Sequence, residues 1–192
     1  MKVNEMALTI IISGMAGSGK TTLAKALAAH YGLKYICGGD ALKEIAIKKG
    51  YHFSGSDWWE TEDGMRFLKE RKNNSDFDKE VDDFLRSKAE DGGYAITSWA
   101  LPWLGAKGIK IWLDADQSTR AKRIMKRDSS THEKALAAVK KRDTENVELY
   151  KKLYGYSIDK DHDVFDLILE TDSKPVEELK KEAIEFIEKN KQ

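Results

Sequence analysis

Two adjoining stretches near the amino terminus decide how the rest of the sequence is interpreted. The first, Leu8-Thr9-Ile10-Ile11-Ile12-Ser13, is a short apolar run rich in β-branched residues, which predicts a strand buried on both faces of a parallel sheet. The second, Gly14-Met15-Ala16-Gly17-Ser18-Gly19-Lys20-Thr21, matches the pattern G-x-x-x-x-G-K-[ST] at every fixed position. Apolar residues at helical spacing then run from Lys20 to Tyr31. Strand, glycine-rich turn and helix are the setting in which this motif binds phosphate.

The chemistry of phosphate binding requires these residue types at these positions. Glycines allow consecutive backbone N–H groups to turn inward around an anion, and the helix that begins at Lys20 adds the positive end of its dipole. The motif places Lys20 to reach the β- and γ-phosphates and the Thr21 hydroxyl to ligate Mg²⁺. We therefore predict a site for ATP and Mg²⁺ built from Gly14, Met15, Ala16, Gly17, Ser18, Gly19, Lys20, Thr21 and Thr22. The sequence lacks the N-K-x-D guanine signature, which argues against a GTPase.

Length and composition restrict the class of protein. The 192 residues are 41% hydrophobic and 34% charged, and no Pro/Gly/Ser-rich stretch divides them, so we expect one globular domain over residues 1–192. The 33 basic and 33 acidic side chains cancel, which argues against a nucleic-acid coat or a membrane-surface binder. The single cysteine, Cys37, excludes an internal disulfide. No apolar run is long enough to span a bilayer, and we expect a cytoplasmic protein.

Strand and helix patterns alternate along the rest of the chain, which predicts an α/β fold with a five-stranded, mostly parallel sheet flanked by helices. The expected strands are Leu8–Ser13, Lys34–Cys37, Tyr94–Thr97, Ile109–Leu113 and Val164–Leu169. The expected later helices are one capped by Asp40 that runs through Ile45 to Lys49, then Glu62–Arg71, Phe77–Glu90, residues 118–127, a helix opened by a Ser130–Glu133 capping box and ending near Leu153, and a last one started by Pro175.

Charge is distributed unevenly between two segments. Residues 54–91 carry twelve acids and seven bases, whereas residues 117–142 carry nine bases and two acids. Phosphoryl transfer depends on cations placed around the transferred group, and Arg120, Arg123 and Arg127 recur at helical spacing. We therefore predict that residues 117–155 form a basic lid that closes over the phosphates and excludes water.

Further motifs follow the phosphate loop in a definite order. They are Gly39-Asp40-Ala41-Leu42-Lys43, Asp78 to Asp82, a strand ending near Ser98, Ile111 to Ala115, Arg120 to Arg123, Lys141 to Asp143, and Tyr150 to Gly155. In this order the sequence resembles the archaeal type of cytidylate kinase, within the nucleoside monophosphate kinases, from about Leu8 to Ile187. The resemblance implies a mobile lid and transfer of the γ-phosphate of Mg·ATP to a nucleoside monophosphate, CMP or dCMP.

The resemblance also implies roles for individual residues. Arg120, Arg123 and Arg142 would contact the transferred phosphate together with Lys20, and Asp40 would lie near Mg²⁺ or the acceptor phosphate. The helical segment of about residues 51–92 would face the acceptor. Within or beside it, the implied acceptor contacts are Asp40, Lys43, Asp82 and Trp99.

Three positions depart from the family pattern on the acceptor side. Lys43 and Leu149 stand where arginines are usual, and Thr97-Ser98-Trp99 replaces a D/E-G-R element. Lysine keeps the charge of arginine but loses its bidentate recognition of phosphate. Two alternatives therefore stay open beside a cytidylate kinase: a kinase of another, non-nucleotide metabolite, and an ATP-hydrolysing switch that acts on a protein or RNA partner. Four tryptophans, Trp58, Trp59, Trp99 and Trp103, lie in these segments and could pack in the core or stack on a substrate.

Overall fold

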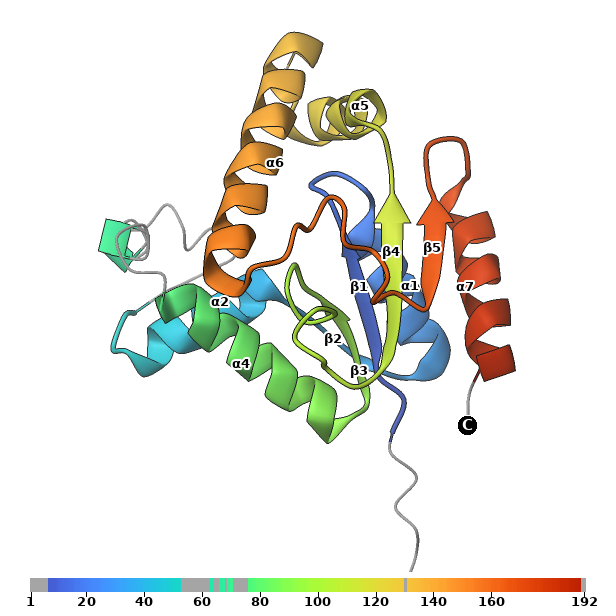
Figure 1. Ribbon diagram of the computed structural model, residues 1–192, viewed down its shortest axis with the longest axis horizontal. Helices are drawn as coiled ribbons and strands as arrows, with labels where there is room; N and C mark the ends of the chain where they lie inside the picture. Colours follow the sequence, from blue (N-terminus) through green and yellow to red (C-terminus); the bar gives the residue numbers. More distant parts are fainter. Residues whose placement is uncertain are drawn as a thin grey trace, which may run out of the picture.

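A central parallel sheet organises the computed structural model, which describes residues 7–52, 63, 66–67, 69–70, 76–129 and 131–190. Its strands are β1 (Ile10–Gly14), β2 (Lys34–Cys37), β3 (Tyr94–Thr97), β4 (Ile109–Asp114) and β5 (Leu167–Glu170). They lie in the order β2-β3-β1-β4-β5, and every neighbouring pair is parallel (Figure 1). β1 is therefore the central strand. The order reverses beside it, and in open α/β sheets ligands bind at such a point, beyond the carboxyl ends of the strands.

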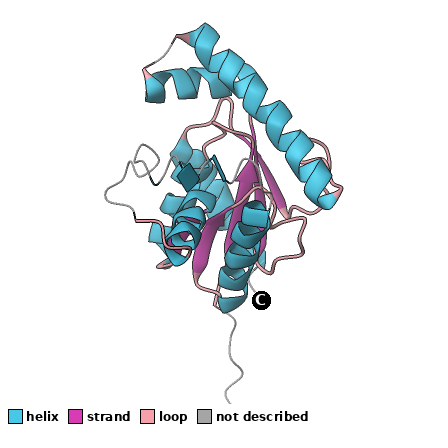
Figure 2. Cartoon of the chain, turned by 90° about the vertical axis from the view of Figure 1, so that its left-hand side faces the viewer, coloured by secondary structure: helices cyan, strands magenta, loops and turns pink. Residues whose placement is uncertain are grey.

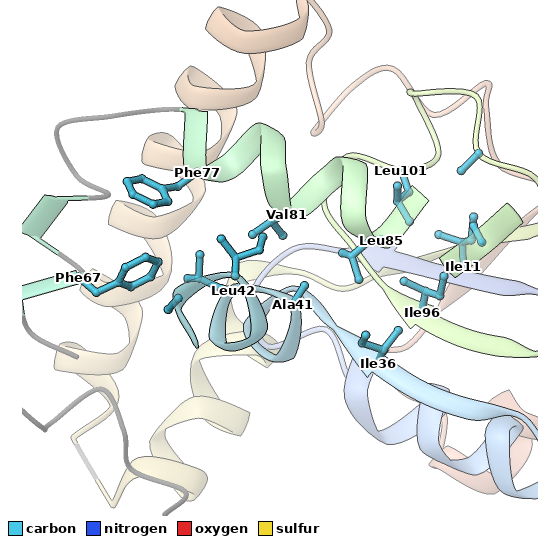
Figure 3. Packing of buried hydrophobic residues seen from close by; sticks show 14 of the residues in the cluster. Ile11, Ile36, Ala41, Leu42, Phe67, Phe77, Val81, Leu85, Ile96 and Leu101 are labelled. Carbon is cyan, nitrogen blue, oxygen red and sulfur yellow. The ribbon is translucent and has the colours of Figure 1, made fainter. Parts of the chain in front are cut away.

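Alternate residues of β1 explain how the sheet is covered on both faces. Ile10 and Ile12 pack with α1 (Lys20–Tyr31) and α7 (Val176–Asn190), whereas Ile11 packs with α2 (Gly38–Lys48) and α4 (Asp76–Asp91). All three isoleucines are fully buried. Figure 3 shows the second layer, where side chains of α2 and α4 meet Ile11, Ile36 and Ile96 of the sheet. A strand covered on both sides needs no polar face, which is why its sequence is an unbroken apolar run.

Two further helices lie beyond the carboxyl ends of the strands. α5 (Gln117–Asp128) follows β4, and α6 (His132–Tyr154) runs back from it towards α4 (Figures 1 and 2). Small and branched side chains join them: Ala121 and Ile124 from α5 pack against Ala135 and Val139 from α6. The basic segment is therefore a helical hairpin at the edge of the sheet where the glycine-rich loop also lies.

The α/β fold with a five-stranded sheet is confirmed, and the sheet is parallel throughout its described strands. The bounds expected for α1, β2 and β3 are also confirmed. The expectation for the fifth strand was wrong at its start, because Val164 lies in a turn and β5 begins at Leu167. Phe165 N–H donates to the His162 carbonyl in that turn, and the Phe165 ring packs on Trp103 and Trp112. Asp166 N–H donates to the Lys110 carbonyl of β4, so the chain joins the sheet only after this turn.

Three helix or strand starts also differ from expectation. β1 begins at Ile10 rather than Leu8. α2 begins at Gly38, and Asp40 caps it from the third helical position, where its carboxylate accepts from Cys37 N–H at 3.0 Å. α6 begins at His132 and is capped by Thr131, whose hydroxyl accepts from Lys134 N–H. In each helix the capping oxygen that the backbone can reach decides the first residue.

Some of the expected residues and elements fall in ranges that the structure does not describe. Trp58, Trp59, Ser130 and most of the expected helix Glu62–Arg71 lie outside the described residues. Among the helices that the structure describes, none has the length and apolar character that crossing a membrane requires.

Candidate active site

A cleft of about 1560 Å³ opens at the carboxyl edge of the sheet. The glycine-rich loop and the start of α1 form its floor through residues 16–22. Its walls come from the ends of β3 and β5 and from α2, α4, α5 and α6. The residues that line these walls include Leu42, Asp78, Val81, Asp82, Leu85, Trp99, Arg123, Arg127, Arg142, Glu145, Leu149, Tyr150, Thr171 and Lys174. Segments far apart in the sequence therefore converge on the loop.

The glycines of the loop allow close backbone packing. Gly14, Gly17 and Gly19 all have positive φ angles, a region that other residues rarely adopt. A Cβ atom on Gly14 would lie 2.6 Å from the Leu113 carbonyl oxygen, and one on Gly17 would lie 3.0 Å from that of Arg120. The loop is thus pressed against β4 on one side and α5 on the other, which holds its backbone in one shape.

Lys20 lies at the centre of the loop. Its Nζ donates to the carbonyl oxygens of Gly14 at 2.6 Å and Met15 at 3.0 Å, and it lies 4.6 Å from the centroid of the Trp99 ring. Burial, together with the positive charges of Arg142 and Arg120, lowers the pKa of Lys20 to about 7. An anionic ligand beside this ammonium would supply the negative charge that the site lacks.

Arg123 joins the loop to the end of β5. Its guanidinium donates to the Ser18 carbonyl at 3.3 Å, to the Thr171 hydroxyl at 3.0 Å and to the Thr171 carbonyl. Arg123 and Arg127 both line the cleft, as does Lys174. Arg127 also forms an exposed ion pair with Asp128. Thr171, which follows β5, is therefore adjacent to the loop.

Arg120 does not reach the cleft, although its sequence spacing placed it with Arg123 and Arg127. It is buried behind the loop, in a bidentate ion pair with Asp143 of α6. The sequence analysis quoted Asp143 only as part of a motif and gave it no role. One signal was present: Asp143 is an acid that directly follows three bases, Lys140 to Arg142. Arg142 itself is exposed and lines the cleft.

Another part of the cleft wall is acidic and aromatic. Asp82 is 4% exposed and accepts from the Tyr154 hydroxyl at 2.8 Å. Burial and the Asp82 carboxylate both raise the pKa of Tyr154, so this phenol stays protonated. Trp99 stacks on Tyr150, with ring centroids 6.4 Å apart. Asp78, which is also buried, lines the same wall.

Two of the expected acceptor contacts, Asp40 and Lys43, do not line the cleft. Asp40 is exposed and Lys43 is half-buried on α2. Leu149, at the position where the family pattern has an arginine, does line it. The structure thus brings Asp82 and Trp99 to the cleft and leaves Asp40 in its capping role.

Few described side chains near the loop could ligate a metal ion. Nowhere in the described ranges do three or more His, Cys, Asp or Glu side chains gather in a way that could hold a metal. Thr21 is exposed at the start of α1 and lines the cleft. A single hydroxyl beside a triphosphate fits Mg²⁺, which keeps few protein ligands and takes the rest from phosphates and water.

Comparison with known proteins agrees with this arrangement of loop, helical hairpin and cleft. A family model described as the cytidylate kinase-like family matches residues 9–173. The chain belongs to the cytidylate kinase-like family. A cytidylate kinase from Pyrococcus horikoshii is 34% identical over 165 residues, which cover 85% of this chain and 80% of that one. One from Pyrobaculum islandicum is 32% identical over 182 residues, or 94% and 92% of the two chains.

Solved structures support the fold of this cytidylate kinase-like chain. An uncharacterized protein from Eubacterium ventriosum has a TM-score of 0.68 at 22% identity, covering 94% of this chain and 98% of that one. Shikimate kinase from Acinetobacter baumannii, in complex with shikimate, has a TM-score of 0.56 at 20% identity, with 99% and 98% covered. Family membership together with these kinase folds makes the protein an ATP-dependent kinase that acts on a nucleotide or small molecule.

Proposed function

We propose that this protein transfers the γ-phosphate of Mg·ATP to CMP or dCMP. The observation that carries the proposal is the convergence, in one cleft, of the glycine-rich loop with Lys20 and of an acceptor wall containing Asp82 and Trp99. The curated relatives are cytidylate kinases at about one-third identity over most of their length. Within the predicted acceptor-side segment, α4 supplies Asp82 to the cleft wall.

In this mechanism the loop amides and Lys20 hold the triphosphate. Lys20 leaves the Gly14 and Met15 carbonyls to neutralise the β- and γ-phosphates, and Arg123 and Arg142 flank the transferred group with positive charge. Thr21 would hold Mg²⁺, which supplies charge neutralisation at the phosphate oxygens when bound. The acceptor oxygen attacks the γ-phosphorus directly, so no residue forms a covalent intermediate. α5 and α6 form the basic lid of residues 117–155, which keeps water from the site.

A coupled ADP-release assay tests the proposal with Mg·ATP and a panel of nucleoside monophosphates. We expect turnover on CMP or dCMP, and a loss of about 100-fold or more in Lys20→Ala, because the variant removes a cation from the phosphates. Lys122→Ala is the matched control: it removes an exposed lysine of α5 that is not among the cleft residues. Failure of every nucleotide would contradict the proposal.

A second candidate function is phosphorylation of a non-nucleotide metabolite. It is favoured by the acceptor wall, where Trp99 and Leu149 replace arginines of the family pattern and the buried carboxylate of Asp82 faces the same space. Carboxylates and aromatic rings suit an acceptor rich in hydroxyl or amino groups better than one bearing a phosphate. ATP consumption that saturates with such a hydroxyl compound, and not with CMP, would select this function. ATP hydrolysis that phosphorylates no acceptor would instead select the ATP-hydrolysing switch that acts on a protein or RNA partner.

A further inference from the structure

The Arg120–Asp143 pair is the most deeply buried ion pair that the described residues form. Arg120 and Asp143 are 3% and 8% exposed. The guanidinium donates to both carboxylate oxygens, at 2.9 and 2.7 Å, and Gln117 Nε2 donates to the same carboxylate at 3.0 Å. Removing two charges from water costs several kcal/mol per ion, so a buried pair is weak evidence for a stabilising role alone. The position of this pair, directly behind the phosphate loop, indicates a role in shaping that loop.

Arg120 uses its remaining donors on backbone carbonyls. Its Nη1 donates to the Ala16 carbonyl at 3.1 Å, and its Nε donates to the Ala115 carbonyl at 3.0 Å. In a trans peptide the C=O and the following N–H point in opposite directions. A guanidinium that holds the Ala16 carbonyl behind the loop therefore turns the Gly17 N–H to the other side, and Gly17 lines the cleft.

Arg123 makes the same kind of contact two residues further along the loop. It donates to the Ser18 carbonyl at 3.3 Å, which orients the Gly19 N–H in the same way. Arg123 is fixed by Thr171, whereas Arg120 is fixed by Asp143. Inward-facing N–H groups are what a glycine-rich loop offers to phosphate. Arg120, from behind the loop, and Arg123, from the cleft wall, thus aim the anion-binding amides.

We propose that Asp143 is a positioning residue for the phosphate loop, acting through Arg120 on the Ala16 carbonyl. Asp143 orients Arg120, Arg120 holds the Ala16–Gly17 peptide, and that peptide presents its N–H to the triphosphate. Because Asp143 belongs to α6, the helical hairpin is tied to the phosphate loop by side-chain chemistry. The inference rests on the ATP site proposed above.

The test measures equilibrium binding of Mg·ATP and of inorganic tripolyphosphate, which probes the phosphate loop alone. Asp143→Asn keeps the shape of the side chain but loses its charge and one acceptor. We expect both ligands to bind about tenfold more weakly, as loss of one aimed charge-assisted contact implies. Glu148→Gln is the matched control, because it removes an exposed acid from the same helix. Asp143→Glu, which keeps the carboxylate, should recover part of the affinity.

A double variant separates positioning from stability. Asp143→Asn leaves Arg120 buried and uncompensated, so it can unfold the protein for that reason alone. Arg120→Met with Asp143→Leu removes both charges at similar volume and should fold, because such replacements are often neutral or stabilising. We expect this folded variant, checked by its Tm, still to bind tripolyphosphate about tenfold more weakly than the wild type.

The outcomes are distinct. Wild-type affinity for tripolyphosphate in the folded double variant, or in Asp143→Asn, would show that the pair only stabilises the fold and would overturn the inference. If the wild-type protein itself bound neither Mg·ATP nor tripolyphosphate, the proposed ATP site would be wrong and the inference would fall with it. Weak binding in both variants with normal binding in Glu148→Gln would support the positioning role.

Discussion

Lys20 and Trp99 face each other where the loop meets the acceptor wall, with the ammonium 4.6 Å from the ring centroid. In the free protein this ammonium is held by two carbonyls of its own loop. Phosphate oxygens compete for the same three N–H donors, so triphosphate binding exchanges these contacts. Among the tryptophans that the structure describes, Trp99 is the one whose ring lies beside this ammonium.

We therefore expect ATP to change the intrinsic tryptophan fluorescence of the protein. The emission of an indole depends on the charge above its ring, and Lys20 moves away from Trp99 when it turns to phosphate. In Trp99→Phe the ATP-dependent change should be lost, whereas Trp103→Phe, whose ring stacks on Tyr156, should retain it. An unchanged ATP response in Trp99→Phe would contradict this assignment. The measurement is an emission titration with Mg·ATP.

Gly14 and Gly32 allow a comparison between close packing and backbone strain. Both have positive φ, but a Cβ on Gly14 meets the Leu113 carbonyl at 2.6 Å, whereas nothing lies within 4 Å of one on Gly32. Gly32→Ala should cost about 1–2 kcal/mol of the free energy of unfolding. Gly14→Ala should cost more, because overpacking adds about 1–3 kcal/mol. Urea unfolding checks the order, and equal losses would show that the contact with β4 relaxes freely.

At the scale of the helices, α5 and α6 each begin after a capping residue. Asp116 caps α5, and its carboxylate accepts from Thr119 N–H at 2.7 Å. α5 then carries Arg120 and Arg123 to the loop, so the register of the arginines depends on where the helix begins. Thr131 does the same for α6 and hence for Asp143. These caps thus define the first residues of the two helices that carry Arg120, Arg123 and Asp143.

The α5 cap should make stability depend on pH. The Thr119 N–H that bonds its carboxylate lowers the pKa of Asp116. A depressed carboxyl pKa contributes stability above the pKa of the unfolded chain, and this contribution is lost as pH falls through the folded pKa. Asp116→Ala should therefore lower the Tm by a few degrees at neutral pH. The gap from wild type should narrow as pH falls below about 3.9, the ordinary value for Asp.

Asp116→Asn serves as the control for this prediction. Its amide oxygen can still cap the helix but does not titrate in this range. It should stay close to the wild type at neutral pH. If the Asp116→Ala gap did not narrow in acid, the cap would not act through its charge. Thermal melts at a series of pH values make the comparison.

At the scale of the whole molecule, opposite charges are separated within a chain of zero formal net charge. The loop, α5 and the residues after β5 line the cleft with Lys20, Arg123, Arg127 and Lys174, whereas α4 lines it with Asp78 and Asp82. α6 contributes both signs of charge, with Arg142 and Glu145. The field inside the cleft therefore depends on tertiary placement and not on the overall balance.

This arrangement predicts that Mg²⁺ enters with the nucleotide. No cluster of acidic, His or Cys ligands offers the ion a site within the part of the chain that the structure describes. MgCl₂ alone should leave the Tm unchanged, whereas Mg·ATP at a hundred times its Kd should stabilise the fold by about 2.7 kcal/mol. EDTA should abolish turnover. A Tm increase with MgCl₂ alone would reveal a protein-held metal and contradict the prediction, as thermal-shift measurements can show.

The sequence by itself determined the sheet, the phosphate loop and the family, because these depend on local patterns. An apolar β-branched run followed by G-x-x-x-x-G-K-T specifies strand, turn and helix within residues 8–31, and the structure has that order. Helical spacing also located α4, α5 and most of α6 to within a few residues. The start of β5 was missed because residues 163–164 form a turn, closed by the Phe165 N–H bond to the His162 carbonyl, which the apolar pattern of Val164 and Phe165 does not reveal.

Only the tertiary structure decided which charged side chains reach the cleft. Arg120, Arg123 and Arg127 are three arginines of one helix. Arg120 nevertheless binds Asp143, 23 residues further along the chain, and does not line the cleft. Asp40 carries the charge expected of a magnesium ligand but caps α2. A charge takes its role from partners that are distant in the chain, because Coulomb and hydrogen-bond energies depend on separation in space. The sequence specifies the charges, and the packing of α5 and α6 on the loop assigns their roles.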